Sequence, residues 1–276
     1  MTTLIAILNS LLTSAFTLLF WPFQNLNPVW ALLFISFLTG IVMLWFFGKV
    51  SNQKAIEQLR NRTRGNLLGV LLYQHDIKVV LRLHGLILRD TFIYLRHTLV
   101  PMLALTVPLV PVLAQLNLFF SFSPLQPGEA AVVKLKLDES AALPDDLDLE
   151  SDSAIRVETS GVHIPSEREI TWRVRAVQPG MHKLIFRIGQ DTVEKNVCVG
   201  GRWSAVSARK TGTWLDLLLY PGEDPLKPGQ RARSIEVRYQ PLSLTVMGWS
   251  MHWLILFFVL SIAVSFAFKG VLGVEL

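Results

Sequence analysis

Basic side chains are concentrated in one short stretch of the sequence, from Lys49 to His97. It holds nine Lys and Arg residues against three Asp and Glu. Eight of the nine form two groups, Lys54, Arg60, Arg62 and Arg64, and then Lys78, Arg82, Arg89 and Arg96. The second group recurs at offsets of 4, 11 and 18 residues, which fall on one face of a helix. The predicted chemistry is electrostatic: these side chains attract anionic lipid, or they bind an acidic nascent chain or ribosomal RNA.

A second set of candidate residues consists of polar side chains within long apolar runs. Its members are Ser36, Thr39, Thr106, Gln115, Asn117, Ser261 and Ser265. In a bilayer, such side chains commonly hydrogen-bond between packed helices. The functional alternative is a hydrophilic groove that opens to the cytoplasm, and the sequence leaves both interpretations open.

Patterns for covalent chemistry are not found in the sequence. It has no phosphate-binding Walker loop, no dinucleotide glycine fingerprint, no HExxH and no paired cysteines. The six histidines are His75, His84, His97, His163, His182 and His252, and the expected topology divides them among three environments. We therefore expect a non-enzymatic protein with no catalytic residue, no metal, no cofactor and no DNA partner. Cys198 is expected to be a small buried residue.

The composition is that of an integral membrane protein. Of 276 residues, 51% are hydrophobic and 17% are charged. Val29–Phe47, Thr98–Phe120 and the run from 242 to 268 contain no charged residue. Each is long enough to cross about 30 Å of hydrocarbon, so the sequence predicts three core spans. Pro101, Pro108 and Pro111 predict that the second span is kinked and packed against other helices.

The distribution of charge predicts the orientation of these spans. Residues 49–97 carry a net charge of +6, whereas residues 122–243 carry sixteen basic and seventeen acidic side chains. Short basic loops stay in the cytoplasm, and long folded domains cross largely regardless of their charge. We therefore expect residues 49–97 inside, residues 122–243 outside, and a cytoplasmic C-terminus next to Lys269.

Residues 4–21 are apolar but carry a narrow polar stripe. It consists of Asn9, Ser10, Thr13, Ser14 and Thr17, which recur at helical spacing. This segment either lies flat as an interfacial helix on the outer face, which the stripe favours, or forms a fourth span. No Lys or Arg precedes it, so we expect no cleavage as a signal peptide.

After Phe120 the hydrophobic period changes from helical to two. Residues 131–137, 170–176, 184–188 and 193–199 alternate or continue such a pattern, and residues 234–239 resemble a last strand. An antiparallel β-sandwich is predicted, with Trp172, Phe186 and Val197 in its core. Residues 144–152 are expected to be an acidic surface loop, and residues 214–220 a short helix.

The expected fold class is an α-helical membrane protein with an inserted extracytoplasmic all-β sandwich. Residues 1–48 form the N-terminal interfacial or fourth helix and the first core span. Residues 49–97 form a basic cytoplasmic helical hairpin, interrupted near His75 and Asp76. Residues 98–121 form the second core span, residues 122–243 the sandwich, and residues 244–276 the third core span and a short cytoplasmic tail.

This order of parts resembles the YidC/Oxa/Alb insertase superfamily. The resemblance lies in Phe20-Trp21-Pro22-Phe23, the span from Val29, the basic hairpin from Ser51, Leu72-Tyr73-Gln74, and the run from Val100-Pro101 to Pro108-Leu109. It covers roughly residues 1–120 and the last span. Two features depart from the family: Val29–Phe47 has no basic residue, and the sandwich replaces a short connection.

The resemblance implies a protein of the bacterial inner membrane with a three-helix core and a coiled-coil arm. It implies a factor that helps polypeptides enter the bilayer without nucleotide hydrolysis, with lipid and nascent membrane proteins or ribosomes as partners. The alternative is a membrane-anchored scaffold whose outer sandwich binds an envelope protein.

Overall fold

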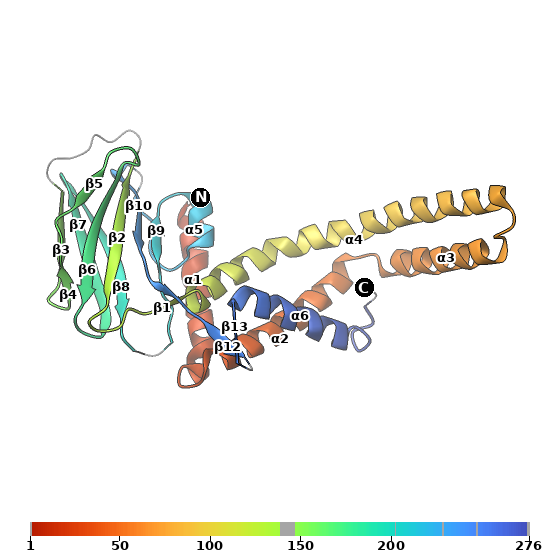
Figure 1. Cartoon of the computed structure of the whole chain (residues 1–276), viewed down its shortest axis with the longest axis horizontal. Helices are drawn as coiled ribbons and strands as arrows, with labels where there is room; N and C mark the ends of the chain where they lie inside the picture. Colours follow the sequence, from red (N-terminus) through yellow and green to blue (C-terminus); the bar gives the residue numbers. More distant parts are fainter. Residues whose placement is uncertain (1, 139–146, 202, 228, 247, 275–276) are drawn as a thin grey trace. The chain divides into compact units, whose positions relative to one another are not determined.

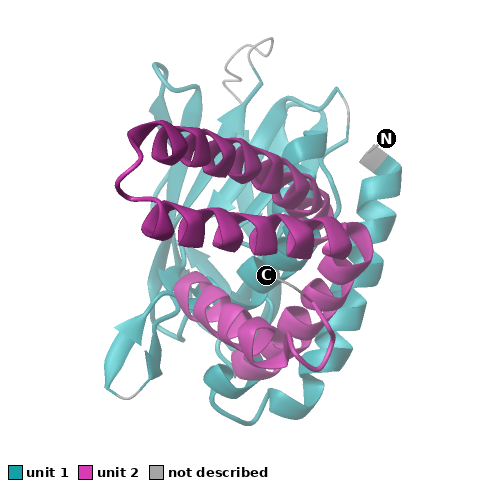
Figure 2. Ribbon diagram, turned by 90° about the vertical axis from the view of Figure 1, so that its right-hand side faces the viewer, with its two compact units in different colours: residues 1–31, 110–253 teal, residues 32–109, 254–276 magenta. Residues whose placement is uncertain are grey.

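The computed structural model describes residues 2–138, 147–201, 203–227, 229–246 and 248–274, a mixture of helices and sheets (Figure 1). The helices are α1 (Thr2–Phe20), the 3-10 helix η1 (Trp21–Phe23), α2 (Pro28–Val50), α3 (Gln53–Leu72), α4 (Ile77–Phe120), α5 (Trp214–Leu219) and α6 (Trp253–Phe268). Two compact units are coloured in Figure 2: unit 1 contains residues 1–31 and 110–253, and unit 2 contains residues 32–109 and 254–276.

Three helices in the described part of the chain are long and apolar enough to cross a membrane, judged by length and composition. They cover Thr3–Phe23, Pro28–Val50 and Ile77–Phe120. The last apolar segment differs from the predicted span, because α6 has only 16 residues, about 24 Å of helix. The residues before it form a hairpin of β12 (Leu244–Val246) and β13 (Trp249–Met251), in whose turn Gly248 adopts a φ of +84°.

Helix α4 is longer than the sequence analysis expected. The second arm of the hairpin and the second span were predicted as two elements, but α4 continues through Pro101, Pro108 and Pro111 as one helix of 44 residues. The predicted interruption near His75 is present as a turn between α3 and α4. The Asp76 carboxylate begins α4 by accepting a hydrogen bond from the amide of Lys78 at 3.0 Å.

Unit 1 contains two antiparallel sheets and two small strand pairs. Its remaining strands are β1 (Phe122–Ser123), β2 (Ala130–Leu137), β3 (Leu147–Ser151), β4 (Ile155–Val157), β5 (Val162–Ile164), β6 (Glu169–Ala176), β7 (Gly180–Ile188), β8 (Asp191–Val199), β9 (Arg209–Thr211), β10 (Ala232–Val237) and β11 (Gln240–Pro241). The larger sheet has the order β4-β6-β2-β10-β9, with β5 also on β6, and the smaller has the order β3-β7-β8. Strands β1 and β11 form a separate pair, as β12 and β13 do.

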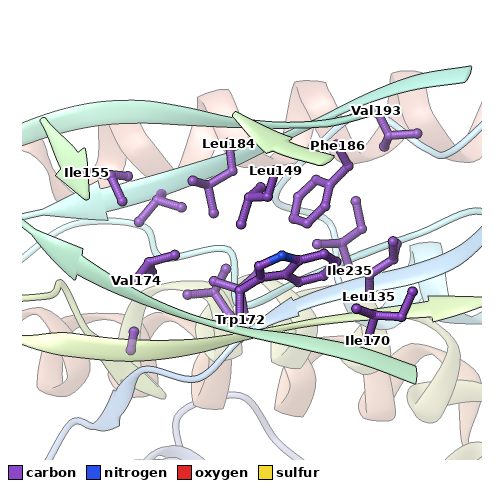
Figure 3. Close-up of a cluster of buried hydrophobic side chains, with 14 of the residues drawn as sticks. Leu135, Leu149, Ile155, Ile170, Trp172, Val174, Leu184, Phe186, Val193 and Ile235 are labelled. Carbon is purple, nitrogen blue, oxygen red and sulfur yellow. The ribbon is translucent and has the colours of Figure 1, made fainter. Parts of the chain in front are cut away.

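One hydrophobic core takes side chains from both sheets (Figure 3). The ring centroids of Trp172 on β6 and Phe186 on β7 lie 5.6 Å apart, edge to face. Val197 on β8 is fully buried in the same cluster. The prediction that these three residues lie in the core is confirmed. The alternating pattern could predict it, because alternate residues of a strand share one face.

The acidic surface loop predicted at residues 144–152 is wrong for the described part of that range. Leu147–Ser151 is strand β3, paired with β7, while residues 139–146 lie outside the described residues. Leu149 is buried and alternates with Asp148 and Glu150. Leu147 and Leu149 alternate with the acidic residues at the period of two that is typical of a strand. The acidic composition of the segment made this alternation easy to miss.

Within unit 1, helix α1 packs through Asn9 and Thr13 of its polar stripe, while Ser10, Ser14 and Thr17 stay exposed. The Asn9 amide donates a hydrogen bond of 2.6 Å to the carbonyl of Leu217 on α5, and the Gln115 amide donates one of 3.0 Å to the Thr13 hydroxyl. At its end, Phe20 joins Phe119, Phe120 and Trp203 in an aromatic cluster, with ring centroids 5.0–5.6 Å from that of Phe20.

The opposite face of α1 remains exposed and is apolar. It carries Leu4, Ile7, Leu8, Leu11 and Leu18, each of which exposes 46% or more of its surface. These residues follow helical spacing, so they form one stripe. Helix α1 therefore has a face packed on the protein and an unpacked apolar face on its other side.

Unit 1 also contains a buried ion pair. Lys195 on β8 and Glu223, in the loop after α5, form an ion pair whose side chains are 0% and 2% exposed. The ammonium also donates to the carbonyl of Ser207 at 2.6 Å, and the second carboxylate oxygen accepts the amide of Asn196 at 3.1 Å. Burial lowers the pKa of Lys195, although the Glu223 carboxylate acts in the opposite direction. The pair fixes the loop to β8.

Candidate functional site

The basic hairpin predicted from the sequence is formed by α3 and the first part of α4, both in unit 2. Asn52 begins α3, since its side-chain oxygen accepts the amide of Ala55 at 3.1 Å. A Cβ at Gly69 would lie 3.1 Å from Leu83, and the Arg62 guanidinium lies 4.0 Å from Asp90. On α3, Arg62 and Gly69 are seven residues apart, and on α4 their partners Asp90 and Leu83 are also seven apart. The two helices run in opposite directions. This is the heptad spacing of an antiparallel coiled coil.

Asp90 is a site residue that the sequence analysis missed. Its carboxylate is 1% exposed and lies 3.8 Å from the guanidinium of Arg89, besides Arg62. Asp90 is the one acidic residue between 77 and 120, and this isolation in the sequence could have indicated a buried partner for the basic residues. The structure therefore gives Arg62 and Arg89 a structural contact in addition to the binding role predicted for them.

The other predicted basic residues lie along the hairpin, and most are open to solvent. Lys54, Arg64, Lys78, Arg82 and Arg96 are exposed, and Arg60 is partly buried. On α4 the basic side chains follow directly after exposed apolar ones, as in Ile77-Lys78 and Leu81-Arg82. One residue corresponds to about 100° of rotation around a helix, so the basic face lies beside an apolar face.

We call this exposed apolar face the α4 stripe. It consists of Ile77, Leu81, Leu88, Phe92, Leu95 and Leu99, which are 52–73% exposed. Its residues are separated by 4, 7, 4, 3 and 4 positions, which keeps them on one helical face. Leu83 and Asp90, which meet α3, lie on the other side of the helix. Helix α4 thus has a second apolar face that no described residue of the hairpin covers.

The predicted polar groove residues divide into separate groups. Two hydroxyls join α6 to α2 within unit 2: Ser261 donates to the carbonyl of Ser36 at 3.2 Å, and Ser265 donates to that of Gly40 at 3.1 Å. The interpretation that such residues hydrogen-bond between helices is confirmed for these two. A Cβ at Gly40 would lie 2.8 Å from the carbonyl oxygen of Ser261, so the helices cross where α2 has no side chain.

The remaining members of that set lie elsewhere. The Thr106 hydroxyl donates to the carbonyl of Met102 on its own helix at 3.1 Å. Gln115 and Asn117 belong to unit 1, where Gln115 bonds to Thr13 and Asn117 accepts from Ser121 at 2.5 Å. The described hydrogen bonds of these three residues therefore do not connect them with Ser261 or Ser265.

Unit 2 instead contains two neighbouring, mainly apolar cavities between its helices. One, of about 290 Å³, is lined by Thr39, Met43, Leu105, Phe257 and Ser261 among others. The second, of about 280 Å³, is lined by Met43, Phe47, Thr98, Met102 and Leu105 among others. Met102 is exposed and lies three residues beyond Leu99, so the second cavity begins where the α4 stripe ends.

Metal chemistry has no candidate centre within the described ranges, where no three His, Cys, Asp or Glu residues are grouped closely enough to hold an ion. The single cysteine, Cys198, is buried on β8, as predicted. Burial raises the pKa of its thiol, while a contact with the Ser204 hydroxyl acts against this shift. A raised pKa leaves less thiolate near neutral pH and makes this cysteine a poor nucleophile.

Comparison with known proteins gives no family for this chain. No family model matches the sequence, and no curated protein matches it. The similar solved structures include two of the S-layer protein SbsC, one of domains 4 and 5 and one of domains 5–6. Their TM-scores are 0.23 and 0.24, with 21% and 19% identity over 29% and 33% of this chain and 47% and 49% of theirs. Likenesses with such low TM-scores establish neither a shared fold nor a shared function.

Proposed function

We propose that this chain is a non-enzymatic, insertase-like factor of membrane-protein biogenesis, located in a bacterial inner membrane. The observation that carries the proposal is the α4 stripe with its basic border. It runs along the arm and ends beside cavities between α2, α4 and α6. An apolar segment held on this stripe has a continuous apolar path along α4, and the basic border attracts acidic groups of the client or the ribosome.

In the proposed arrangement, α2, α4 and α6 form the membrane core. The basic hairpin is cytoplasmic, the two sheets form an outer sandwich, and α1 lies flat on the outer leaflet. Two faces of α1 support this placement, since Asn9 on one face bonds to α5 and the leucines on the opposite face are free to enter lipid. The basic loop from 49 to 97 supports the cytoplasmic position of the hairpin.

The topology predicts a clear labelling pattern. In a Cys198→Ser background, a cysteine at the exposed Gln190 is expected to react with a membrane-impermeant maleimide in intact spheroplasts. A cysteine at the exposed Asn61 is expected to react only after permeabilisation, because the charge bias holds its loop inside. Mass spectrometry of the intact protein measures the labelled fraction at each position. The reverse pattern would contradict the topology and the proposed function.

Reversing exposed charges on the arm is expected to weaken client capture. The double variant Arg64→Glu/Arg82→Glu avoids Arg62 and Arg89, whose substitution would disturb buried Asp90. We expect binding to ribosomes carrying an apolar nascent segment to fall at least about tenfold, which corresponds to about 1.4 kcal/mol. Wild-type binding should also weaken steeply as salt rises, because screening shortens the electrostatic range to about 8 Å at physiological ionic strength. Co-sedimentation measures both effects.

Two further variants define what the arm recognises. Lys227→Glu/Arg238→Glu makes the same change in net charge on exposed residues of unit 1 and should leave binding intact. Leu88→Ser/Phe92→Ser removes part of the α4 stripe without changing charge and should reduce capture of the apolar segment. If capture persists in both arm variants and cells grow normally, the scaffold alternative is favoured over an insertase.

A further inference from the structure

A polar groove runs along one flank of α1 in unit 1. It has a volume of about 580 Å³, within the range of roughly 300–1,000 Å³ that is usual for small-molecule sites. One wall is the hydroxyl side of α1, and the other is the loop that carries Glu223 and Asp224, together with Asn196 on β8. From Ser10 to Trp21, the α1 wall extends about 16 Å.

The walls of this groove present hydrogen-bond acceptors. The hydroxyls of Ser14 and Thr17 donate to carbonyls of their own helix, at 2.9 and 2.7 Å, so their oxygens face the groove as acceptors. Asp224 adds an exposed carboxylate on the other wall. No Lys or Arg is among the described residues that line the groove. The lining therefore suits a ligand rich in hydroxyl donors and disfavours a phosphate.

The walls are fixed before any ligand binds. The buried Lys195–Glu223 pair holds the loop to β8, and the Asn9 bond to Leu217 holds α1 to α5. The charge of Glu223 is compensated by Lys195, which leaves Asp224 as the one lining carboxylate without a described ion pair. An exposed ion pair contributes little, because water already solvates both charges, so a cationic amine would gain little at this position.

An aromatic ring stands at one end of the groove. Trp21 in η1 lines it and exposes 69% of its surface. A large indole in this position offers a flat apolar surface beside polar groups. A sugar ring needs this combination, because its C–H face is apolar and its hydroxyls project from its rim. We propose that the α1 groove binds a short neutral saccharide, either free or as the headgroup of a glycolipid.

This proposal can be tested on the full chain in phosphatidylcholine nanodiscs, without a client. The soluble probe is chitotetraose, and the lipid probe is diglucosyl-diacylglycerol mixed into the nanodisc. Saturation-transfer NMR and calorimetry should detect chitotetraose if the source is a free glycan. Stabilisation against heat by the glycolipid alone would identify a lipid headgroup instead. Either result supports the site only if the variants below behave as stated.

Matched variants locate the binding. Ser14→Leu fills the groove, whereas Ala15→Leu adds the same side chain at the next position, which is exposed and does not line it. Trp21→Ala removes the ring, whereas Trp30→Ala removes an exposed tryptophan that does not line the groove. We expect Ser14→Leu and Trp21→Ala each to weaken saccharide binding at least about tenfold, and the two controls to leave it unchanged.

Three results would overturn the proposal. The first is no binding of either saccharide probe to the folded wild-type protein, with folding checked by circular dichroism. The second is saccharide binding that Ser14→Leu and Trp21→Ala leave unchanged. The third is binding of spermine or inorganic phosphate at the same site in preference to both saccharides.

Discussion

Replacing Lys195 by methionine is expected to destabilise unit 1 by about 3–5 kcal/mol, because it leaves the Glu223 carboxylate buried without its partner. The carboxylate is 2% exposed and keeps only the amide of Asn196 as a hydrogen-bond donor among its described contacts. The substitution also removes the donor to the carbonyl of Ser207. Thermal unfolding of the purified full chain, followed by near-ultraviolet circular dichroism, measures the loss.

The control for this variant is an exposed ion pair on the same sheet. Lys183 on β7 lies 2.8 Å from Glu194 on β8, with side chains 62% and 51% exposed. Lys183→Met should cost far less than Lys195→Met, because water solvates the remaining carboxylate. Replacing Lys195 and Glu223 together by Met and Leu should recover much of the lost stability. Equal losses for Lys183→Met and Lys195→Met would contradict the importance of burial.

Adding a single methyl group at Gly40 is expected to force α2 and α6 apart. The new Cβ would lie 2.8 Å from the backbone oxygen of Ser261, which no rotation of a side chain can relieve. Gly40→Ala should therefore cost about 1–3 kcal/mol, as overpacking does, and should weaken the hydrogen bonds from Ser261 and Ser265. Gly40→Leu should prevent stable assembly of unit 2. The thermal midpoint and the yield of detergent-solubilised protein report both effects.

Gly65 provides a matched glycine on α3. A Cβ at Gly65 would meet nothing within 4 Å, so Gly65→Ala only exchanges a poor helix former for a good one. It should raise stability by up to about 1 kcal/mol. If Gly40→Ala lowers the stability and Gly65→Ala raises it, then packing at the α2–α6 crossing, and not helix propensity, determines the loss in Gly40→Ala. A stabilising Gly40→Ala would contradict the described crossing.

Local periodicity was sufficient to predict the five longest described strands, β2, β6, β7, β8 and β10, and the hairpin, because those elements bury one face. The shorter strands carry too few residues to show a period. The alternation around Trp172 and Phe186 survives in β6 and β7, and the turn before α4 lies at the predicted interruption. The same pattern placed Lys195 on the inward face with Val193 and Val197, which was a usable sign of a buried charge. Its partner Glu223 is 28 residues away in a loop, where no local pattern indicates it.

The candidate site was predicted less completely, because its residues depend on contacts between distant segments. The basic positions were found, but Asp90 and the α4 stripe were not. On α4 the basic residues define one face clearly in the sequence. The apolar residues that directly precede them were therefore not recognised as a second exposed face. The polar residues within the spans could be recognised from their positions in apolar runs, but their hydrogen-bond partners depend on which segment each one meets. Composition cannot show that Ser261 meets the Ser36 carbonyl while Gln115 meets Thr13.

The bond between Asn9 and the carbonyl of Leu217 joins residues that are 208 positions apart, and that separation determines when α1 can dock. A ribosome adding about 5–20 residues per second reaches Leu217 roughly 10–40 seconds after it has made Asn9. During that interval the first helix has left the ribosome before its docking partner has been synthesised. The face that carries Asn9 therefore waits for a partner that is made much later, so α1 is among the last elements to reach its final position.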